Sequence, residues 1–131
     1  MQTPPELPNQ LASYVPDLRR SDDEFRLRLL LHGFGLVWQH ATHAERVQLV
    51  ASEPAHVTPR WDSFLAAYVE HLCQTHGIAP PAWTQQPQRR LAEHWHAGGC
   101  FAFDHERSAA TTPPAFDAHG IWLPADELIV V

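Results

Sequence analysis

A strong helical pattern of apolar residues lies in the middle of the chain, between Thr58 and His76. Thr58 is a good N-cap, and Pro59 falls at the first helical position, where its missing N–H costs nothing. Gly77 follows as a natural left-handed residue that ends a helix. The pattern predicts one helix with a single apolar stripe, whose positions recur at helical spacing: Trp61, Phe64, Leu65, Tyr68 and Leu72.

A second long helix is predicted to begin near Ser21. Ser21 and Glu24 have the spacing of a capping box, in which the two side chains satisfy backbone N–H groups of the first turn. The segment 25–38 is apolar on nearly every side, which is typical of a central helix. Gly33 and Gly35 weaken a helix interior by about 1 kcal/mol each. We expect one weakened helix here, rather than two separate ones.

A shorter helix is expected from Thr42 to about Ser52. Thr42 and Glu45 again have capping-box spacing. Val47 and Val50 are expected to face the core, and the proline at position 54 ends the helix.

The C-terminal third predicts shorter elements. A helix is expected after Pro87, carrying Leu91 and Trp95 and closing at the glycine pair 98–99. Segment 100–103 alternates like a strand but is too short to assign. The remaining expectations are one helical turn from Pro113 ended by Gly120, an extended triplet 121–123 and a last turn from Pro124.

The first 20 residues read as an arm. Prolines at positions 4, 5, 8 and 16 are expected to prevent a helix from propagating. Apolar residues such as Leu11 and Leu18 keep the arm from being purely polar. Two interpretations stay open: a frayed arm whose apolar side chains touch the body, or a docking arm for a partner or a second copy of the chain.

Length and composition bound the fold class. The chain has 131 residues, and 44% of them are hydrophobic, which fits one globular domain. We therefore expect a mainly α, single compact domain of about five or six short helices over residues 21–131, after a proline-rich arm over residues 1–20. The predicted core is Phe25, Leu29, Leu30, Trp61, Phe64, Leu65, Tyr68, Leu72, Trp83, Leu91, Trp95, Phe116 and Trp122.

Charge and hydropathy restrict the partners. The formal net charge is −6, so contacts with a phosphate backbone would work against the field of the protein, and no nucleic-acid binding is expected unaided. No apolar run approaches the ~18 residues of a membrane span, and no leader-like segment opens the chain. The expectation is a cytoplasmic protein without membrane contact.

The ten histidines are the main candidates for chemistry. His40 and His43 are three residues apart, but the expected cap at Thr42 places them across a helix boundary. On a helix, the pair at positions 94 and 96 would diverge, and so would the pair at positions 71 and 76. Scattered histidines are therefore favoured over a metal site, and no metal or cofactor is expected.

Neither cysteine is a strong candidate nucleophile. Cys73 lies on the flank of the predicted central helix, which favours inert burial, whereas Cys100 follows two glycines and is the more plausible exposed thiol. An activated thiol needs an electropositive, partly exposed setting. The chain contains no P-loop, dinucleotide fingerprint or nucleophile elbow. No catalytic residue is therefore assigned.

Three segments resemble an uncharacterised helical domain of GC-rich bacteria: RWDSFLAAYVEHL (60–72), GIAPPAWT (77–84) and TTPPAFDAHGIWLPADEL (111–128). The resemblance covers roughly residues 45–128. Relatives of this type often carry a helix-turn-helix segment at the N-terminus, and some are encoded beside predicted nucleotidyltransferases, as in toxin–antitoxin pairs. The resemblance implies a regulatory or antitoxin-like module. Residues 1–20 are too short and proline-rich for a DNA-reading helix pair, so DNA binding is not carried over.

Two functions remain as hypotheses. The first is a non-enzymatic accessory or antitoxin-like regulator that binds a partner protein or a second copy of itself. The aromatic content supports it, because some aromatic surface is expected near Tyr14 or Trp122. The alternative is a metal- or thiol-dependent enzyme that uses part of the histidine set.

Overall fold

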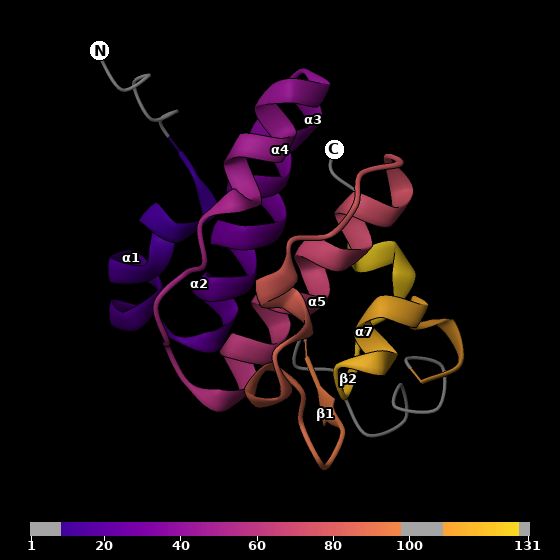
Figure 1. The fold of residues 1–131 in the computed structure, drawn as a ribbon. Helices are drawn as coiled ribbons and strands as arrows, with labels where there is room; N and C mark the ends of the chain where they lie inside the picture. The colour runs from indigo at the N-terminus through magenta and orange to yellow at the C-terminus, as the bar shows by residue number, and fades with distance from the viewer. Residues whose placement is uncertain (1–8, 98–108, 129–131) are drawn as a thin grey trace.

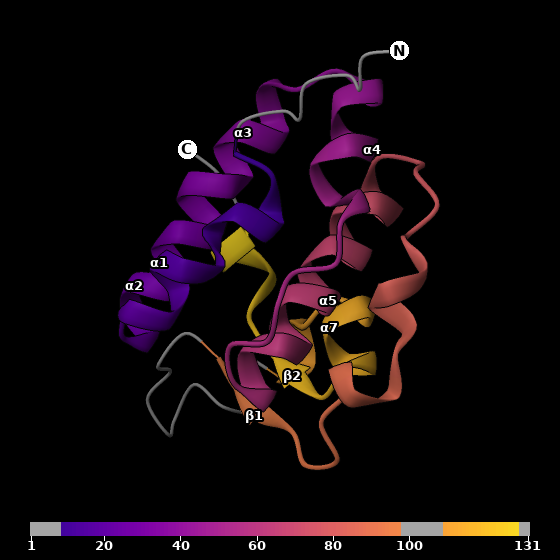
Figure 2. The same cartoon turned by 60° about the vertical axis from the view of Figure 1, so that its left-hand side comes forward.

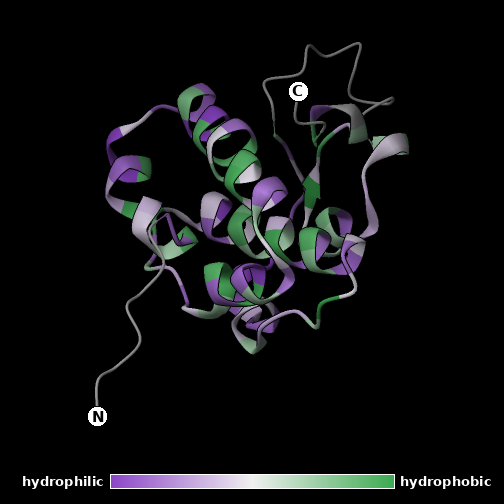
Figure 3. Cartoon of the chain, turned by 90° about the horizontal axis from the view of Figure 1, so that it is seen from above, coloured by the Kyte–Doolittle hydropathy of each residue, from purple (hydrophilic) through white to green (hydrophobic). Residues whose placement is uncertain are grey.

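The longest helix, α5 (Pro59–Thr75), passes through the middle of the molecule (Figures 1 and 2). Helices α1 to α4 pack on one side of it and the short C-terminal elements on the other. The computed structural model describes residues 9–97 and 109–128, which form a compact, mainly α fold, as expected. Hydrophobic residues are concentrated where the helices meet (Figure 3).

Helix α5 has the predicted ends. The Thr58 side chain accepts a hydrogen bond from the backbone N–H of Trp61 at 3.3 Å, and Pro59 starts the helix. Gly77 has a φ of 65°, and the N–H of Ile78 donates to the carbonyl of Cys73 at 2.9 Å. These features form a Schellman-type end.

The environment of α5 differs from the single-stripe prediction. Every residue in segment 61–69 is buried, including the polar residues Asp62 and Ser63. Both were expected away from the centre of the stripe. Their burial follows from the packing of other elements on both sides of the helix.

The N-terminal expectation is wrong for residues 11–20. They form the 3₁₀ turn η1 (Leu11–Tyr14) and helix α1 (Val15–Arg20). Pro16 lies in the first turn of α1, where its missing N–H needs no partner. Leu11 and Leu18 are fully buried, so the expected contact between this segment and the body is confirmed. Residues 1–8 lie outside the described residues.

One continuous helical rod follows, as expected, made of α2 (Asp23–Arg28), a π-helical segment (Leu29–Phe34) and α3 (Gly35–His40). Its cap is Asp22, not Ser21: Asp22 Oδ1 accepts from the backbone N–H of Phe25 at 2.8 Å. The weakening expected around Gly33 takes the form of the π turn.

Helix α4 (His43–Ala51) follows α3 in the chain and packs against η1. Its predicted capping box is confirmed, with Thr42 and Glu45 bonded in both directions. Val50 is buried as expected, but Val47 is exposed and Leu49 takes the second buried position.

The helix predicted after Pro87 is wrong. Two 3₁₀ turns, η3 (Ala82–Gln85) and η4 (Pro87–Arg89), lead into strand β1 (Trp95–His96), which pairs in parallel with β2 (Ile121–Trp122). Segment 91–97 is extended instead of helical because its backbone N–H groups donate to carbonyls of segment 119–122.

The C-terminal turns are as predicted: α7 (Pro114–Ala118) and η6 (Ala125–Leu128). Gly120 has a φ of 81°, and a Cβ at that position would lie 2.7 Å from the carbonyl oxygen of Leu91. Glycine is therefore required where β2 begins beside residues 91–95.

Most of the predicted core is correct. Six of its members are buried, on the rod of residues 23–40, on α5 or on α7: Leu30, Trp61, Phe64, Leu65, Tyr68 and Phe116. Trp83 is also buried, whereas Leu29, Leu72, Leu91, Trp95 and Trp122 are partly buried. Phe25 is the error, since its side chain is 50% exposed. The helix register places it outward at the first turn.

We predict that Trp61→Ala lowers the free energy of unfolding by about 3–5 kcal/mol, as buried aromatic truncations do. The Trp61 ring packs against Trp95 and Phe64, and its indole N–H donates to Asp23 Oδ1 at 2.8 Å. Denaturant melts measure the change, with the exposed Leu36→Ala as control. Coincident melts of Trp61→Ala and the parent would show that this ring is not an anchor of the core.

Candidate functional site

A fully buried guanidinium, that of Arg89, lies beside the start of α5. It donates to the carbonyl oxygen of Pro54 at 2.7 Å and to that of Asp62 at 3.2 Å. It also lies 3.4 Å from the Glu53 carboxylate and 5.0 Å from the centre of the Trp83 ring. These contacts join η4, the loop before α5 and α5 itself, so this arginine serves the architecture and cannot reach a phosphate.

A second polar group in the interior is the buried His119, which pairs with the partly buried Glu70. The Nδ1 atom of His119 lies 2.7 Å from the carbonyl oxygen of Arg89 and therefore donates to it. Its Nε2 atom lies 2.6 Å from Glu70 Oε2. Both ring nitrogens are thus engaged, and the ring is inaccessible to solvent. The pair holds the end of α7 against α5 and presents no free atom to a substrate.

The histidines at positions 94 and 96 were expected to diverge, but they do not. Because the chain is extended there, residues two apart lie on the same face. Both rings pack on Trp122, with centroids 4.6 Å and 4.4 Å away, and His94 Nε2 lies 2.9 Å from Asp117 Oδ1. His40 and His43 lie on either side of a helix boundary, as expected.

No metal-binding cluster is found within residues 9–97 and 109–128: no three or more His, Cys, Asp or Glu side chains there are placed to hold an ion. Cys73 is fully buried, which confirms the expectation for this residue. Burial, reinforced by Glu70, raises the pKa of the Cys73 thiol to about 11. The segment with Cys100 lies outside the described residues.

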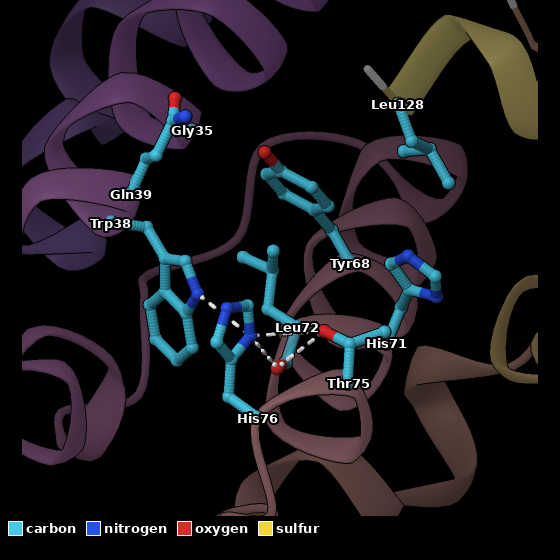
Figure 4. Close-up of a pocket in the computed structure, with 9 residues that line it drawn as sticks. All are labelled: Gly35, Trp38, Gln39, Tyr68, His71, Leu72, Thr75, His76 and Leu128. Carbon is cyan, nitrogen blue, oxygen red and sulfur yellow. Dashed lines mark hydrogen bonds between the residues drawn. The ribbon is translucent and has the colours of Figure 1, made fainter. Parts of the chain in front are cut away.

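The main candidate site is a pocket between α3 and α5, with a volume of about 220 Å³ (Figure 4). Its walls come from α3, from the C-terminal half of α5 and from η6. The lining residues are Gly35, Trp38, Gln39, Tyr68, His71, Leu72, Thr75, His76 and Leu128. They include no Asp, Glu or Arg, so the described wall of the pocket carries hydrogen-bonding groups but no fixed charge.

Two histidines, His71 and His76, line this pocket together. Their five-residue spacing was expected to separate them on a helix. That expectation is wrong because α5 ends at Thr75, and His76 already departs from helical geometry with a ψ of 12°. Burial, and secondarily the neighbouring His76, lowers the pKa of His71 below its ordinary value. The imidazole of His71 is therefore neutral near pH 7.

His76 is an exposed residue whose ring lines the pocket and contacts Trp38. The indole N–H of Trp38 donates to its Nδ1 atom at 3.3 Å, and the Thr75 hydroxyl and the Leu72 carbonyl each lie 3.0 Å from the same atom. The indole can only donate and the carbonyl can only accept, so these two contacts of Nδ1 call for opposite tautomers of the ring. The Trp38 and His76 rings meet edge to face at 5.6 Å.

The Tyr68 hydroxyl is the most informative polar group of the pocket. The residue is only 2% exposed, yet no described residue forms a hydrogen bond with its hydroxyl. The ring projects from α5 into the space between α3 and Leu128 (Figure 4). Burial, and secondarily Tyr14, raises the pKa of Tyr68, so the hydroxyl stays protonated. The fully buried side-chain atoms without a partner in the described part of the chain include Ser63 Oγ and Arg89 Nε but not the Tyr68 hydroxyl, so this hydroxyl is accessible from the pocket.

A second candidate surface is a shallow hollow at the start of α2. It has a volume of about 150 Å³ and is lined by Asp22, Glu24, Phe25 and Arg28. Glu24 and Arg28 form an ion pair at 3.3 Å across one turn. An aromatic ring that is half exposed is thereby surrounded by charged side chains. Tyr14 and Trp122, where some aromatic surface was expected, are partly buried, and Phe25 is the more exposed aromatic residue.

Sequence reasoning missed both surfaces. It placed Tyr68 and Phe25 in the core by periodicity alone, and it treated the histidine pairs 71/76 and 94/96 as parts of an ideal helix. The three acids directly before Phe25 are the signal that a first helical turn, open to solvent, begins there.

The comparisons with known proteins leave the family open: no protein-family model, no curated protein and no solved structure matches the chain. The resemblance of segments 60–72, 77–84 and 111–128 to a bacterial helical domain therefore stays a hypothesis. In the described part of the chain, no helix has the length and apolar character needed to cross a membrane.

We predict that Cys73 resists alkylation by iodoacetamide at pH 8 in the folded protein and reacts on unfolding. A pKa of about 11 leaves little thiolate at that pH, and burial blocks the reagent. Mass spectrometry of a Cys100→Ser variant, in which Cys73 is the remaining thiol, measures the rate. Labelling as fast as in denaturant would reveal a reactive thiol and favour the thiol-enzyme hypothesis.

Proposed function

We propose that this chain is a non-enzymatic, protein-binding regulatory module of the antitoxin-like kind, and that its partner docks on the hollow around Phe25. The observation that carries the proposal is the 50% exposure of this ring in a rim of Asp22, Glu24 and Arg28. Aromatic anchors within a polar rim are typical of the energetic centres of interfaces.

The charge of the molecule supports a protein partner over DNA. Net charge is −6, and all four arginines in its two Arg-Arg pairs are engaged internally or with an acid; Arg90 donates to the carbonyl oxygen of Ala118 and to Gln85. Arg89 is buried, Arg19 donates to the carbonyl oxygen of His56, and Arg20 pairs with Asp17 at 2.9 Å. A phosphate backbone would find few free guanidinium groups, whereas a basic protein surface would be attracted.

The alternative, a metal- or thiol-dependent enzyme, has weaker support. Its thiol route through Cys73 meets a buried sulfur with a raised pKa. Its metal route would need histidines that converge, and His94 and His119 are already held by Asp117 and Glu70. Elemental analysis of the purified protein tests this alternative, because stoichiometric zinc or iron would favour it.

We predict that Phe25→Ser abolishes partner capture while the fold is retained. Since the ring is half exposed, its removal costs little core packing, and the melt should shift by no more than about 1 kcal/mol. The tagged chain is purified from its native host, and the partner identified by mass spectrometry is titrated against parent and variant. Leu36→Ser, which alters another exposed apolar side chain, is the matched control.

Three results would contradict this proposal. One is equal capture by Phe25→Ser and the parent, and another is equal loss in Leu36→Ser. The third is tight DNA binding by the chain alone in a low-salt mobility-shift assay. Light scattering of the purified chain tests for a second copy as partner, in which case Phe25→Ser should yield the monomer.

A further inference from the structure

We propose that the pocket between α3 and α5 binds a small, uncharged planar molecule that offers a hydrogen-bond acceptor to the Tyr68 hydroxyl. This site uses none of the residues around Phe25. The proposal is therefore independent of the protein-binding function and stands or fails by itself.

The hydroxyl of Tyr68 is the first argument. A hydroxyl that faces a pocket can exchange its water for an acceptor on a bound molecule at little net cost. Tyr68 lines the pocket, its hydroxyl forms no hydrogen bond with a described residue, and it is not one of the fully buried unpartnered atoms of the described chain, so it is accessible from the pocket. A carbonyl oxygen or ring nitrogen of a bound molecule would supply the acceptor.

The chemistry of the walls argues for an uncharged ligand. The described lining has no acidic or arginine side chain that could neutralise a charge. His71 is neutral near pH 7, because burial lowers its pKa. An ion would lose its hydration without gaining a counter-charge, which is costly. The net charge of −6 further disfavours an anion.

The shape and size of the pocket argue for one ring. Rings of Trp38, Tyr68 and His76 form much of its wall, with Leu72 and Leu128 completing it. Aromatic walls favour planar ligands that stack or pack edge to face. A volume of about 220 Å³ corresponds to roughly seven waters at about 30 Å³ each, which is room for a single substituted ring.

Three matched probes test the proposal on the intact chain: benzamide, benzoate and toluene. Benzamide has a planar ring and an uncharged carbonyl acceptor, benzoate adds a charge, and toluene lacks the acceptor. Binding is followed by the shift of the Trp38 indole N–H resonance, assigned with Trp38→Phe. We expect saturable shifts with benzamide that map to Trp38, and weaker binding of the other two.

The variant Tyr68→Phe removes only the hydroxyl. We expect it to weaken benzamide binding about fivefold to tenfold, the effect of one lost hydrogen bond, and to leave toluene binding unchanged. Its melt should match or exceed that of the parent, because no partner is lost inside the protein. Tyr14→Phe, which removes a hydroxyl outside the pocket lining, is the matched control and should bind all three probes as the parent does.

Several results would overturn the site. They are the absence of any shift at Trp38 with benzamide, benzoate binding as tight as benzamide, or unchanged benzamide affinity in Tyr68→Phe. A lower stability of Tyr68→Phe, without an effect on binding, would show that its hydroxyl is satisfied within the protein. Loss of partner capture in Phe25→Ser would leave each of these outcomes unaffected.

Discussion

The burial of segment 61–69 of α5 on all sides is the constraint on which the rest of the structure depends. A helix that loses solvent around its whole circumference must find internal partners for every polar group near it. Arg89 meets this demand at the N-terminal end by donating to the carbonyls of Pro54 and Asp62. The pair of His119 and Glu70 meets it further along, and so joins α7 to α5.

This arrangement explains why a histidine-rich chain shows few reactive groups in its described part. The histidines at positions 94 and 119 are held by acids, and a third, His76, contacts an indole N–H. Among the fully buried side chains of the described residues, Ser63 Oγ and Arg89 Nε have no hydrogen-bond partner. Two other places offer groups to the outside: Tyr68 presents a hydroxyl to the pocket between α3 and α5, and Phe25 is 50% exposed. We interpret both as positions completed by another molecule.

Local signals along the sequence were sufficient to predict the helical class and the ends of α4 and α5. Thr42, Thr58 and Gly77 act through hydrogen bonds and backbone conformation within a few residues, so their effect can be inferred without tertiary structure. The prediction of one continuous helix through segment 25–38 is also correct, because it too rests on residues within the segment. Apolar periodicity also identified the buried face of α5, but it gave no indication of how many sides are covered.

What could not be predicted depends on partners distant in the chain. From the sequence alone, residues 91–97 are predicted to form a helix. Their extended conformation depends on hydrogen bonds from their N–H groups to the carbonyls of residues 119–122. The buried position of Arg89 requires carbonyls 27 and 35 residues away. The pocket arises because α3 and α5 approach each other and His76 leaves the helical path, neither of which periodicity describes.

The most direct test of this account is the stability of Arg89→Met. Methionine keeps an apolar stem beside Trp83 but removes the donors to the loop and to α5. We expect the free energy of unfolding to fall by about 3 kcal/mol, because buried carbonyls lose their partners. Arg90→Met, at an exposed neighbour that donates to Ala118 and Gln85, should change it by less than about 1 kcal/mol. Equal melting of Arg89→Met and the parent would contradict the claim that this buried guanidinium holds the fold around α5.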